Sequence, residues 1–285
     1  MQVEPGKFQI YVGPILIEFR LPTCWIPEFE ATWCRWLKPF DTSSRKVCHH
    51  AQIDITSRDQ QGQAWRHPRL KNYSPDKSVW HWGSDPRYFE QEPWLDWRGQ
   101  TTDRRIHVDL GVRNVLAQLA YSYNASLMHA STVIIDDAAF VAPGKSGRGK
   151  TTFFKALGGY DAGHLHEDLA FIFEDHVYSV PCKSSSTSWD MPVPNRVSLA
   201  GFIELGRAPH PRVTTLTAQT DKLRVISAAI VYPISRWQSA QGDFVMATLA
   251  NWSQVYPCLV VEFPRNVSTE LLHAELLNGI STIRD

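Results

Sequence analysis

A glycine-rich segment in the middle of the chain has the spacing of a phosphate-binding loop. Residues 144–151 read Gly-Lys-Ser-Gly-Arg-Gly-Lys-Thr and fit the pattern G-x-x-x-x-G-K-[ST]. Glycines let the backbone approach phosphate oxygens, on which its amide groups then converge. Lys150 is suited to neutralise the β- and γ-phosphates, Thr151 to bind Mg²⁺, and Thr152 to contact the α-phosphate. The predicted nucleotide site comprises Gly144, Lys145, Ser146, Gly147, Arg148, Gly149, Lys150, Thr151 and Thr152.

The segments that flank this loop have the patterns that such a loop requires. A β-prone apolar run at residues 138–142 precedes it, and a helical pattern at residues 151–157 follows it. Strand, loop and helix in this order are the setting in which phosphate-binding loops work. The context therefore favours a nucleotide site over a chance surface loop rich in glycine and lysine.

Two adjacent carboxylates, Glu167 and Asp168, follow the loop helix after a short predicted strand at residues 164–166. A right-handed crossover would bring the end of that strand close to the bound phosphates. One carboxylate could then hold Mg²⁺ together with Thr151, while the other accepts a proton from a hydroxyl. The alternative is a solvated turn.

His164 and His166 occupy alternate positions of the short strand and could share one face of it. Either chemistry or packing would explain them. Two further acidic pairs, Asp136-Asp137 and Glu174-Asp175, have the setting of turns rather than of catalytic groups.

The elements that must position these residues follow from the periodicity of the apolar residues. Residues 131–135 and 138–142 predict a β-hairpin that turns at Asp136-Asp137. The sequence also predicts helices at 112–124, 222–230, 244–255 and 269–277, and a strand at 259–263. This alternation predicts an α/β domain that covers residues 110–285.

The first 109 residues differ in composition from the rest. Their short apolar runs, such as 8–12 and 15–19, predict a β-rich N-terminal region that could recognise the acceptor. The tryptophans of this region could anchor a binding interface or pack in a core. They are Trp25, Trp33, Trp36, Trp65, Trp80, Trp82, Trp94 and Trp97.

Charge and hydropathy exclude several classes of partner. The 29 basic residues balance the 29 acidic ones, which disfavours nucleic acid and membrane surfaces. No apolar run reaches the roughly 20 residues that cross a bilayer. The N-terminus lacks the pattern of a signal peptide, so we expect a cytoplasmic protein. The five cysteines are scattered without a C-x-x-C pair, which predicts buried or inert thiols, and Cys48-His49-His50 is expected in a loop.

Taken in order, residues 128–130, the hairpin, the loop and Glu167-Asp168 resemble HPr kinase/phosphorylase. The likeness is strongest to small HPr-kinase-like proteins in which a strand-rich part precedes an H-A-x-x-V…G-x-S-G-x-G-K-[ST]…D-[DE] core. It covers roughly residues 110–285, and its motifs lie between 128 and 168. The fold implied is a P-loop HPr-kinase-like C-terminal domain.

The resemblance implies an ATP- and Mg²⁺-dependent kinase that acts on a serine or similar hydroxyl. His129, Lys150, Glu167 and Asp168 match the family's catalytic positions, and Thr151 and Asp168 match its metal-binding positions. The first acidic residue is the usual proton acceptor. Without the resemblance, the sequence favours a core histidine at a helix–strand junction for His129. The family often forms rings or dimers, so this chain could be a homo-oligomer.

Two departures from the family pattern bear on activity. Glu167 stands where the family generally has Asp, and the family's E-[IV]-R-G motif has no match, since Asn195-Arg196-Val197-Ser198 occupies that region. Full phosphorylase activity is therefore not expected.

The sequence leaves two classes of function open. The leading hypothesis is a kinase that transfers the γ-phosphoryl group of ATP to serine or threonine of a peptide or protein, or to a small metabolite. The alternative is a non-catalytic, nucleotide-responsive peptide-binding protein. A plain hydrolase ranks lower, because no residue marks a position for attacking water.

Overall fold

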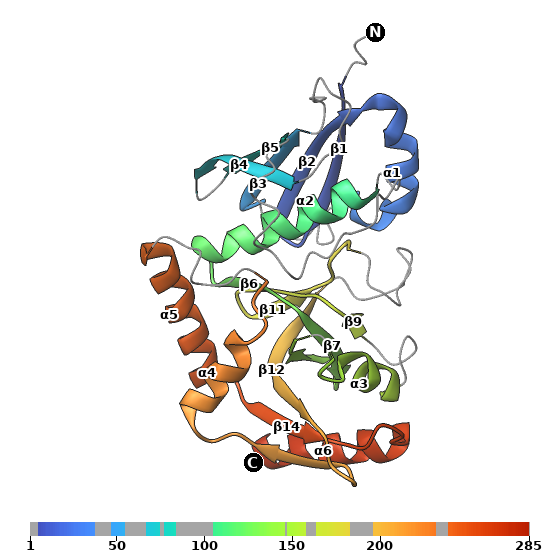
Figure 1. The fold of residues 1–285 in the computed structure, drawn as a ribbon, viewed down its shortest axis with the longest axis vertical. Coiled ribbons are helices and arrows are strands. Elements are labelled where there is room, and N and C mark those ends of the chain that lie inside the picture. The colour runs from blue at the N-terminus through green and yellow to red at the C-terminus, as the bar shows by residue number, and fades with distance from the viewer. Residues whose placement is uncertain are drawn as a thin grey trace. The chain divides into compact units, whose positions relative to one another are not determined.

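The chain contains two compact units, Met1–Val115 and Leu116–Asp285, each with its own β-sheet (Figure 1). The structure is a computed structural model that describes residues 5–37, 47–54, 67–74, 77–83, 105–145, 147–157, 164–182, 196–231 and 239–284. Among these residues, no helix is long and apolar enough to cross a membrane.

Unit 1 is built on a five-stranded sheet with the order β1-β2-β3-β5-β4. Its strands are β1 (Pro5–Val12), β2 (Ile15–Pro22), β3 (His49–Asp54), β4 (His67–Ser74) and β5 (Lys77–Gly83). The predicted strands at 8–12 and 15–19 lie within β1 and β2. The loop expected at His49-His50 is wrong, because these residues pair with Ile15 and Leu16 of β2 and begin β3.

Aromatic residues form the core of unit 1 beneath helix α1 (Ile26–Thr32). Trp33 is fully buried, with its ring centroid 5.9 Å from that of Phe8 and 5.3 Å from that of Phe29. Trp36 is also buried. For these two tryptophans core packing is therefore the right explanation. Trp65, Trp94 and Trp97 lie outside the described residues.

Helix α2 (Arg105–Gln118) follows, and its buried Asp109 accepts a 2.8 Å hydrogen bond from Arg113 Nε one turn later. The helix begins seven residues before the predicted start at 112 and gives way to a 3-10 turn at Leu119–Tyr121. Asp109 and Arg113 thus form an ion pair within one helix, and this pair accounts for the buried charge of Asp109 without a functional site.

Unit 2 is built on a larger mixed sheet with the order β6-β10-β11-β12-β8-β7-β9, in which β14 pairs with β12 and β13. Its strands are β6 (Ala125–Met128), β7 (Ala130–Ile135), β8 (Ala138–Pro143), β9 (His164–His166), β10 (Ala170–Phe173), β11 (His176–Tyr178), β12 (Arg196–Gly206), β13 (Arg212–Thr215) and β14 (Cys258–Glu262). Its helices are α3 (Lys150–Ala156), α4 (Gln219–Ser227), α5 (Ser239–Val255) and α6 (Thr269–Arg284).

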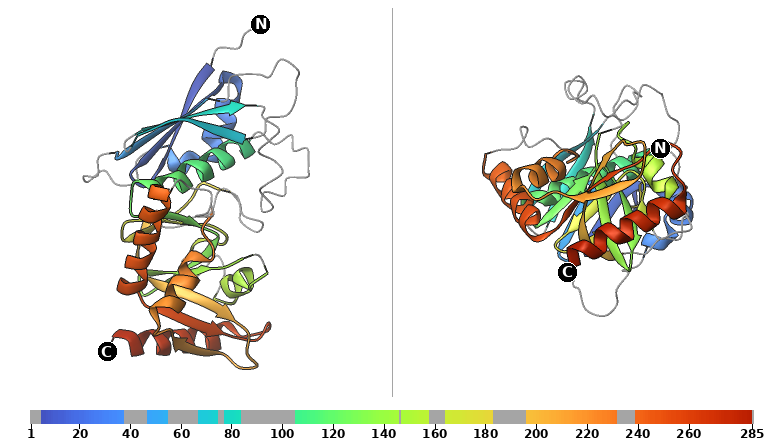
Figure 2. Two further views of the ribbon diagram at one scale, coloured as in Figure 1. Left: turned by 60° about the vertical axis from the view of Figure 1, so that its left-hand side comes forward. Right: turned by 90° about the horizontal axis from the view of Figure 1, so that it is seen from below.

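Helices cover both faces of this sheet (Figure 2). Val225 of α4 and Trp252 of α5 belong to one buried cluster, whereas Phe153 of α3 and Leu276 of α6 belong to another. Strand β8 sends alternate side chains into the two clusters, as a strand buried on both faces does. Unit 2 is therefore a three-layer α/β structure, which agrees with the predicted α/β class.

The predicted hairpin between β7 and β8 is confirmed. Its two turn residues, Asp136 and Asp137, have φ of 50° and 59°, the left-handed values that a two-residue type I′ turn requires. Aspartate tolerates this region better than most residues, since its short side chain can bond locally. Glu174-Asp175 likewise joins β10 to β11, with Glu174 at φ 55°.

The cysteines only partly follow the expectation of buried or inert thiols. All five are free, and Cys182 and Cys258 are buried, but Cys24 and Cys34 are exposed. Burial is wrong for these two because they lie in short 3-10 turns beside α1 rather than in the sheet, and their inertness stays a prediction.

Burial, aided by nearby Glu204, raises the pKa of the Cys258 thiol to about 12. Because the thiolate is the reactive form, we expect Cys258 to resist iodoacetamide in the folded protein at about pH 8. Exposed Cys24 and Cys34 should be alkylated first, as peptide mass spectrometry of a time course would show. Labelling of Cys258 as fast as Cys24, without unfolding, would contradict its placement in the core.

Candidate active site

The glycine-rich loop begins where β8 ends, and hydrogen bonds tie it to the strand beside it. Gly144 N donates to His129 O at 3.1 Å, and Arg148 N donates to Lys145 O at 3.3 Å. Gly149 caps α3, and its carbonyl accepts from Phe153 N at 2.8 Å. Ser146 lies outside the described residues. The strand–loop–helix order expected from the sequence is present.

Gly147 and Gly149 adopt backbone conformations that suit glycine, with φ of 84° and 97°. An added Cβ would meet no atom within 4 Å at either position. The requirement for glycine at these two positions is therefore conformational rather than steric.

Replacing Gly149 with alanine is expected to lower the free energy of unfolding by about 1–2 kcal/mol, the cost of a left-handed L-residue. Urea unfolding would measure it. Gly144→Ala is the matched control, because the added Cβ at Gly144 meets Arg148 Cβ at 3.4 Å and Cγ at 3.6 Å, which are ordinary contacts, and no left-handed φ is required. Equal losses in the two variants would contradict the conformational explanation.

Lys150 is folded back onto the loop that precedes it. Its side chain is buried, and Nζ donates to Gly144 O at 2.7 Å and to Lys145 O at 3.2 Å. Burial lowers the pKa of Lys150, while the charges of Asp168 and Glu167 act in the opposite direction. A cation that is partly stripped of water and held at a glycine-rich loop is poised to bind an anion.

The acidic pair, Glu167-Asp168, directly follows strand β9, which pairs antiparallel with β7. Because β7 lies between β9 and β8, the short strand is not the direct neighbour of the loop strand. The expected crossover nevertheless brings Asp168 and Glu167 within electrostatic reach of Lys150. A backbone hydrogen bond also links the acidic pair to the start of β7, since Ala130 N donates to Asp168 O at 3.1 Å.

The two carboxylates lie in different surroundings. Glu167 is 2% exposed, whereas the Asp168 side chain is 33% exposed. Asp168 Oδ1 lies 3.2 Å from Nδ1 of His129, whose side chain is 35% exposed. Of the two acidic groups, Asp168 is therefore the one open to a substrate in this structure.

Main-chain hydrogen bonds hold both the N–H and the carbonyl of His129 in place. Its N–H donates to Ala229 O at 2.7 Å, and its carbonyl accepts from Gly144 N. These bonds connect β7, the loop after β8 and the segment that follows α4. With its ring partly exposed, His129 is not the core histidine that the sequence alone allowed.

The remaining loop residues are also located. Lys145, Arg148 and Thr151 are exposed, and Thr152 is half-buried. The structure thus gathers His129, Gly144, Lys150, Glu167 and Asp168 into one cluster around the end of β8, with the exposed side chains of the loop at its border.

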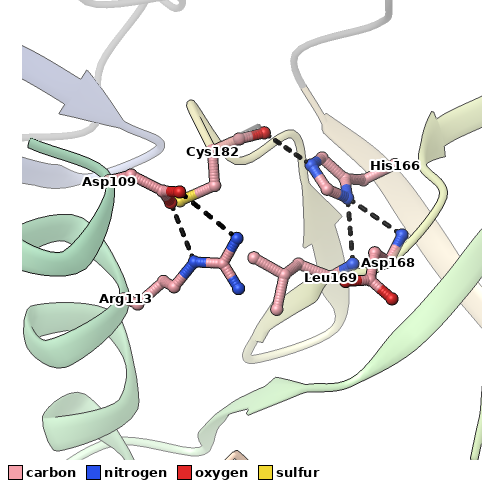
Figure 3. A network of polar contacts seen from close by, with 6 residues as sticks. All are labelled: Asp109, Arg113, His166, Asp168, Leu169 and Cys182. Carbon is pink, nitrogen blue, oxygen red and sulfur yellow. Dashed lines mark hydrogen bonds and ion pairs between the residues drawn. The ribbon is translucent and has the colours of Figure 1, made fainter. Parts of the chain in front are cut away.

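His166 takes part in three hydrogen bonds that the sequence did not reveal (Figure 3). Its Nδ1 accepts from Asp168 N at 3.1 Å and Leu169 N at 2.9 Å, and its Nε2 lies 2.8 Å from Cys182 O. The partner at Cys182 lies 16 residues along the chain. No local sequence signal marks such a contact, because a carbonyl acceptor can belong to any residue type.

Comparison with known proteins adds little to what the geometry of this cluster indicates about function. No protein-family model matches the chain, and no curated protein matches it. Among solved structures it has a distant similarity to the Hpr(Ser) kinase/phosphatase from Coxiella burnetii, at 12% identity and a TM-score of 0.30. The match covers 56% of this chain and 99% of that one. A likeness of this size carries no argument about activity.

Proposed function

We propose that unit 2 binds ATP at residues 144–152 and transfers its γ-phosphoryl group to a hydroxyl acceptor. The observation that supports this most is the His129–Asp168 pair, about one third exposed and 3.2 Å apart, beside the buried cation of Lys150 at a glycine-rich loop. A phosphate-binding cation and an acid–base pair are the two kinds of group that phosphoryl transfer requires.

Lys150 is proposed to hold the β- and γ-phosphates together with the amides of the loop. Its present partners are two backbone carbonyls, so it enters the reaction already desolvated and close to the loop. Pre-placed positive charge stabilises the transition state because little reorganisation is needed when phosphoryl charge develops.

His129 is proposed to accept the proton of the acceptor hydroxyl, with Asp168 as the group that orients it. If Nδ1 donates its hydrogen to Asp168 Oδ1, Nε2 is the basic nitrogen of the ring. The acceptor oxygen then bonds to the γ-phosphorus as the bond to the ADP oxygen breaks, and its proton passes to His129. An oriented imidazole of this kind contributes about 10²–10⁴-fold to rate.

Glu167 takes a different role in this proposal from the proton acceptor expected by resemblance. At 2% exposure its carboxylate is remote from an incoming hydroxyl, but its charge favours the cationic form of Lys150. We therefore propose that Glu167 supports the charge of Lys150 rather than removing a proton.

The residues present fit a bound Mg²⁺. Among the described residues no group of three or more His, Cys, Asp or Glu side chains could hold a metal ion. Mg²⁺ ordinarily takes only one or two protein carboxylates, with water and phosphate oxygens completing its shell. The exposed hydroxyl of Thr151 and the accessible carboxylate of Asp168 would hold it, and when bound it would neutralise charge on the phosphates.

The acceptor class is proposed as serine or threonine of a peptide or protein, or a hydroxyl metabolite. The N-terminal region, residues 1–109, is proposed to recognise it.

The test is to incubate the protein with γ-labelled ATP, Mg²⁺ and pools of peptides and metabolites, and to follow label by mass spectrometry. A phosphorylated acceptor formed by the wild type would support the kinase. Nucleotide binding without phosphoryl transfer to any of several acceptor pools would favour the non-catalytic peptide-binding alternative instead.

A further inference from the structure

We propose that His166 is a positioning residue of this site, a neutral imidazole with its proton on Nε2 that fixes the turn carrying Glu167 and Asp168. The catalytic part of this inference rests on the proposed phosphoryl transfer. Its structural part can be tested without any activity.

The hydrogen-bond partners of His166 select a single tautomer. The backbone N–H groups of Asp168 and Leu169 can only donate, so the Nδ1 atom that they approach at 3.1 and 2.9 Å must be unprotonated. The Cys182 carbonyl can only accept, so Nε2, 2.8 Å away, must carry the proton. His166 as a whole is 5% exposed, and this burial keeps water from competing for these bonds.

The three bonds hold the residue that orients the proposed base. Asp168 is bound at three points: its N–H by His166 Nδ1, its carbonyl by Ala130 N, and its carboxylate by His129 Nδ1. The next residue, Leu169, is buried and leads into β10. With the main chain of Asp168 fixed on both sides, its carboxylate meets His129 in one geometry.

Positioning of this kind matters for rate because small displacements of a catalytic group are costly. A shift of about 1 Å can lower a rate by about 10²-fold. The contribution of His166 is therefore expected in kcat, through Asp168 and His129. Nucleotide affinity should not depend on it, since Lys150 Nζ is held by the carbonyls of Gly144 and Lys145.

Two substitutions separate the roles of the two ring nitrogens of His166. In His166→Asn, the amide oxygen stands as many bonds from Cα as Nδ1 does and can accept the same two backbone N–H groups, as in an Asx turn. In His166→Gln, the longer side chain can still donate toward Cys182 O but has no acceptor at the Nδ1 position. The first variant keeps the bonds to the turn, and the second loses them.

We expect His166→Gln to lower kcat by about 10²-fold while the Kd for nucleotide changes by less than about two-fold. His166→Asn should restore kcat to within about ten-fold of wild type. Circular dichroism and urea unfolding check that both variants fold. A His166→Gln enzyme with wild-type kcat would overturn the positioning role, as would equal losses in the two variants.

The tautomer is measured on the wild-type chain by long-range ¹H–¹⁵N NMR of the His166 ring. We expect Nε2 protonated, Nδ1 unprotonated, and slow hydrogen exchange at the amides of Asp168 and Leu169. A ring protonated on Nδ1 would overturn the inference whatever the activity. If the ring gives the expected signature but no acceptor is ever phosphorylated, the proposed function fails and the structural part stands.

Discussion

Replacing Lys150 with methionine is expected to lower kcat for phosphoryl transfer by about 10²–10³-fold or more, the usual loss when a charge-stabilising group is removed. Lys150 is the buried cation at the loop, where its Nζ donates to the carbonyls of Gly144 and Lys145. Steady-state kinetics with the acceptor from the pooled assay would measure the loss, and titration calorimetry would measure nucleotide affinity.

The fold should survive this substitution. Burial lowers the pKa of Lys150, which means that the folded environment disfavours its charge, so methionine removes that cost while it removes two hydrogen bonds. We expect the free energy of unfolding to stay within about 1 kcal/mol of wild type. The matched control is Lys155→Met, on an exposed position of the same helix. Comparable kinetic losses in both variants would mean that Lys150 has no special part.

Replacing Asp168 with asparagine is the second large effect expected. Asparagine keeps the size of the side chain and an oxygen that can accept from His129 Nδ1, but it removes the negative charge. Without that charge, an imidazolium formed in the reaction is no longer stabilised, and kcat should fall by about 10²–10⁴-fold. A neutral amide oxygen also binds Mg²⁺ more weakly than a carboxylate does, so more Mg²⁺ should be needed for the half-maximal rate, which a metal titration would detect.

The chain offers a close control for this variant. Asp175 forms a comparable pair with His176, Oδ1 to Nδ1 at 2.6 Å, in the turn between β10 and β11. Asp175→Asn removes the same charge from the same kind of pair in the same unit. It should leave kcat unchanged, so a loss that matches Asp168→Asn would point to a general effect on the fold.

Local features of the site were predictable because each depends on few neighbouring residues. The hairpin could be predicted from two aspartates between β-prone runs, and both take the left-handed φ that the turn needs. The loop could be predicted because glycines mark where the backbone takes positive φ, as Gly147 and Gly149 do. Helix α6 covers the predicted span at 269–277 because its apolar period is regular.

Features that depend on tertiary contacts were not predictable in the same way. The difference in burial between Glu167 and Asp168 arises from the packing of β9 against β7, and adjacent letters in a sequence carry no sign of it. The hydrogen bond from His166 to Cys182 joins two residues that strands β10 and β11 separate along the sequence. The sequence predicts a loop at His49 because its strand is recognisable only through its parallel partner, β2.

The most direct test of the central claim is the transfer of label from γ-³²P ATP to an acceptor pool by wild type, Lys150→Met and Asp168→Asn, measured side by side. The proposed function predicts a labelled acceptor with the wild type and almost none with either variant, while Asp175→Asn behaves as wild type. Equal labelling by all four proteins, or none by the wild type despite bound nucleotide, would contradict it.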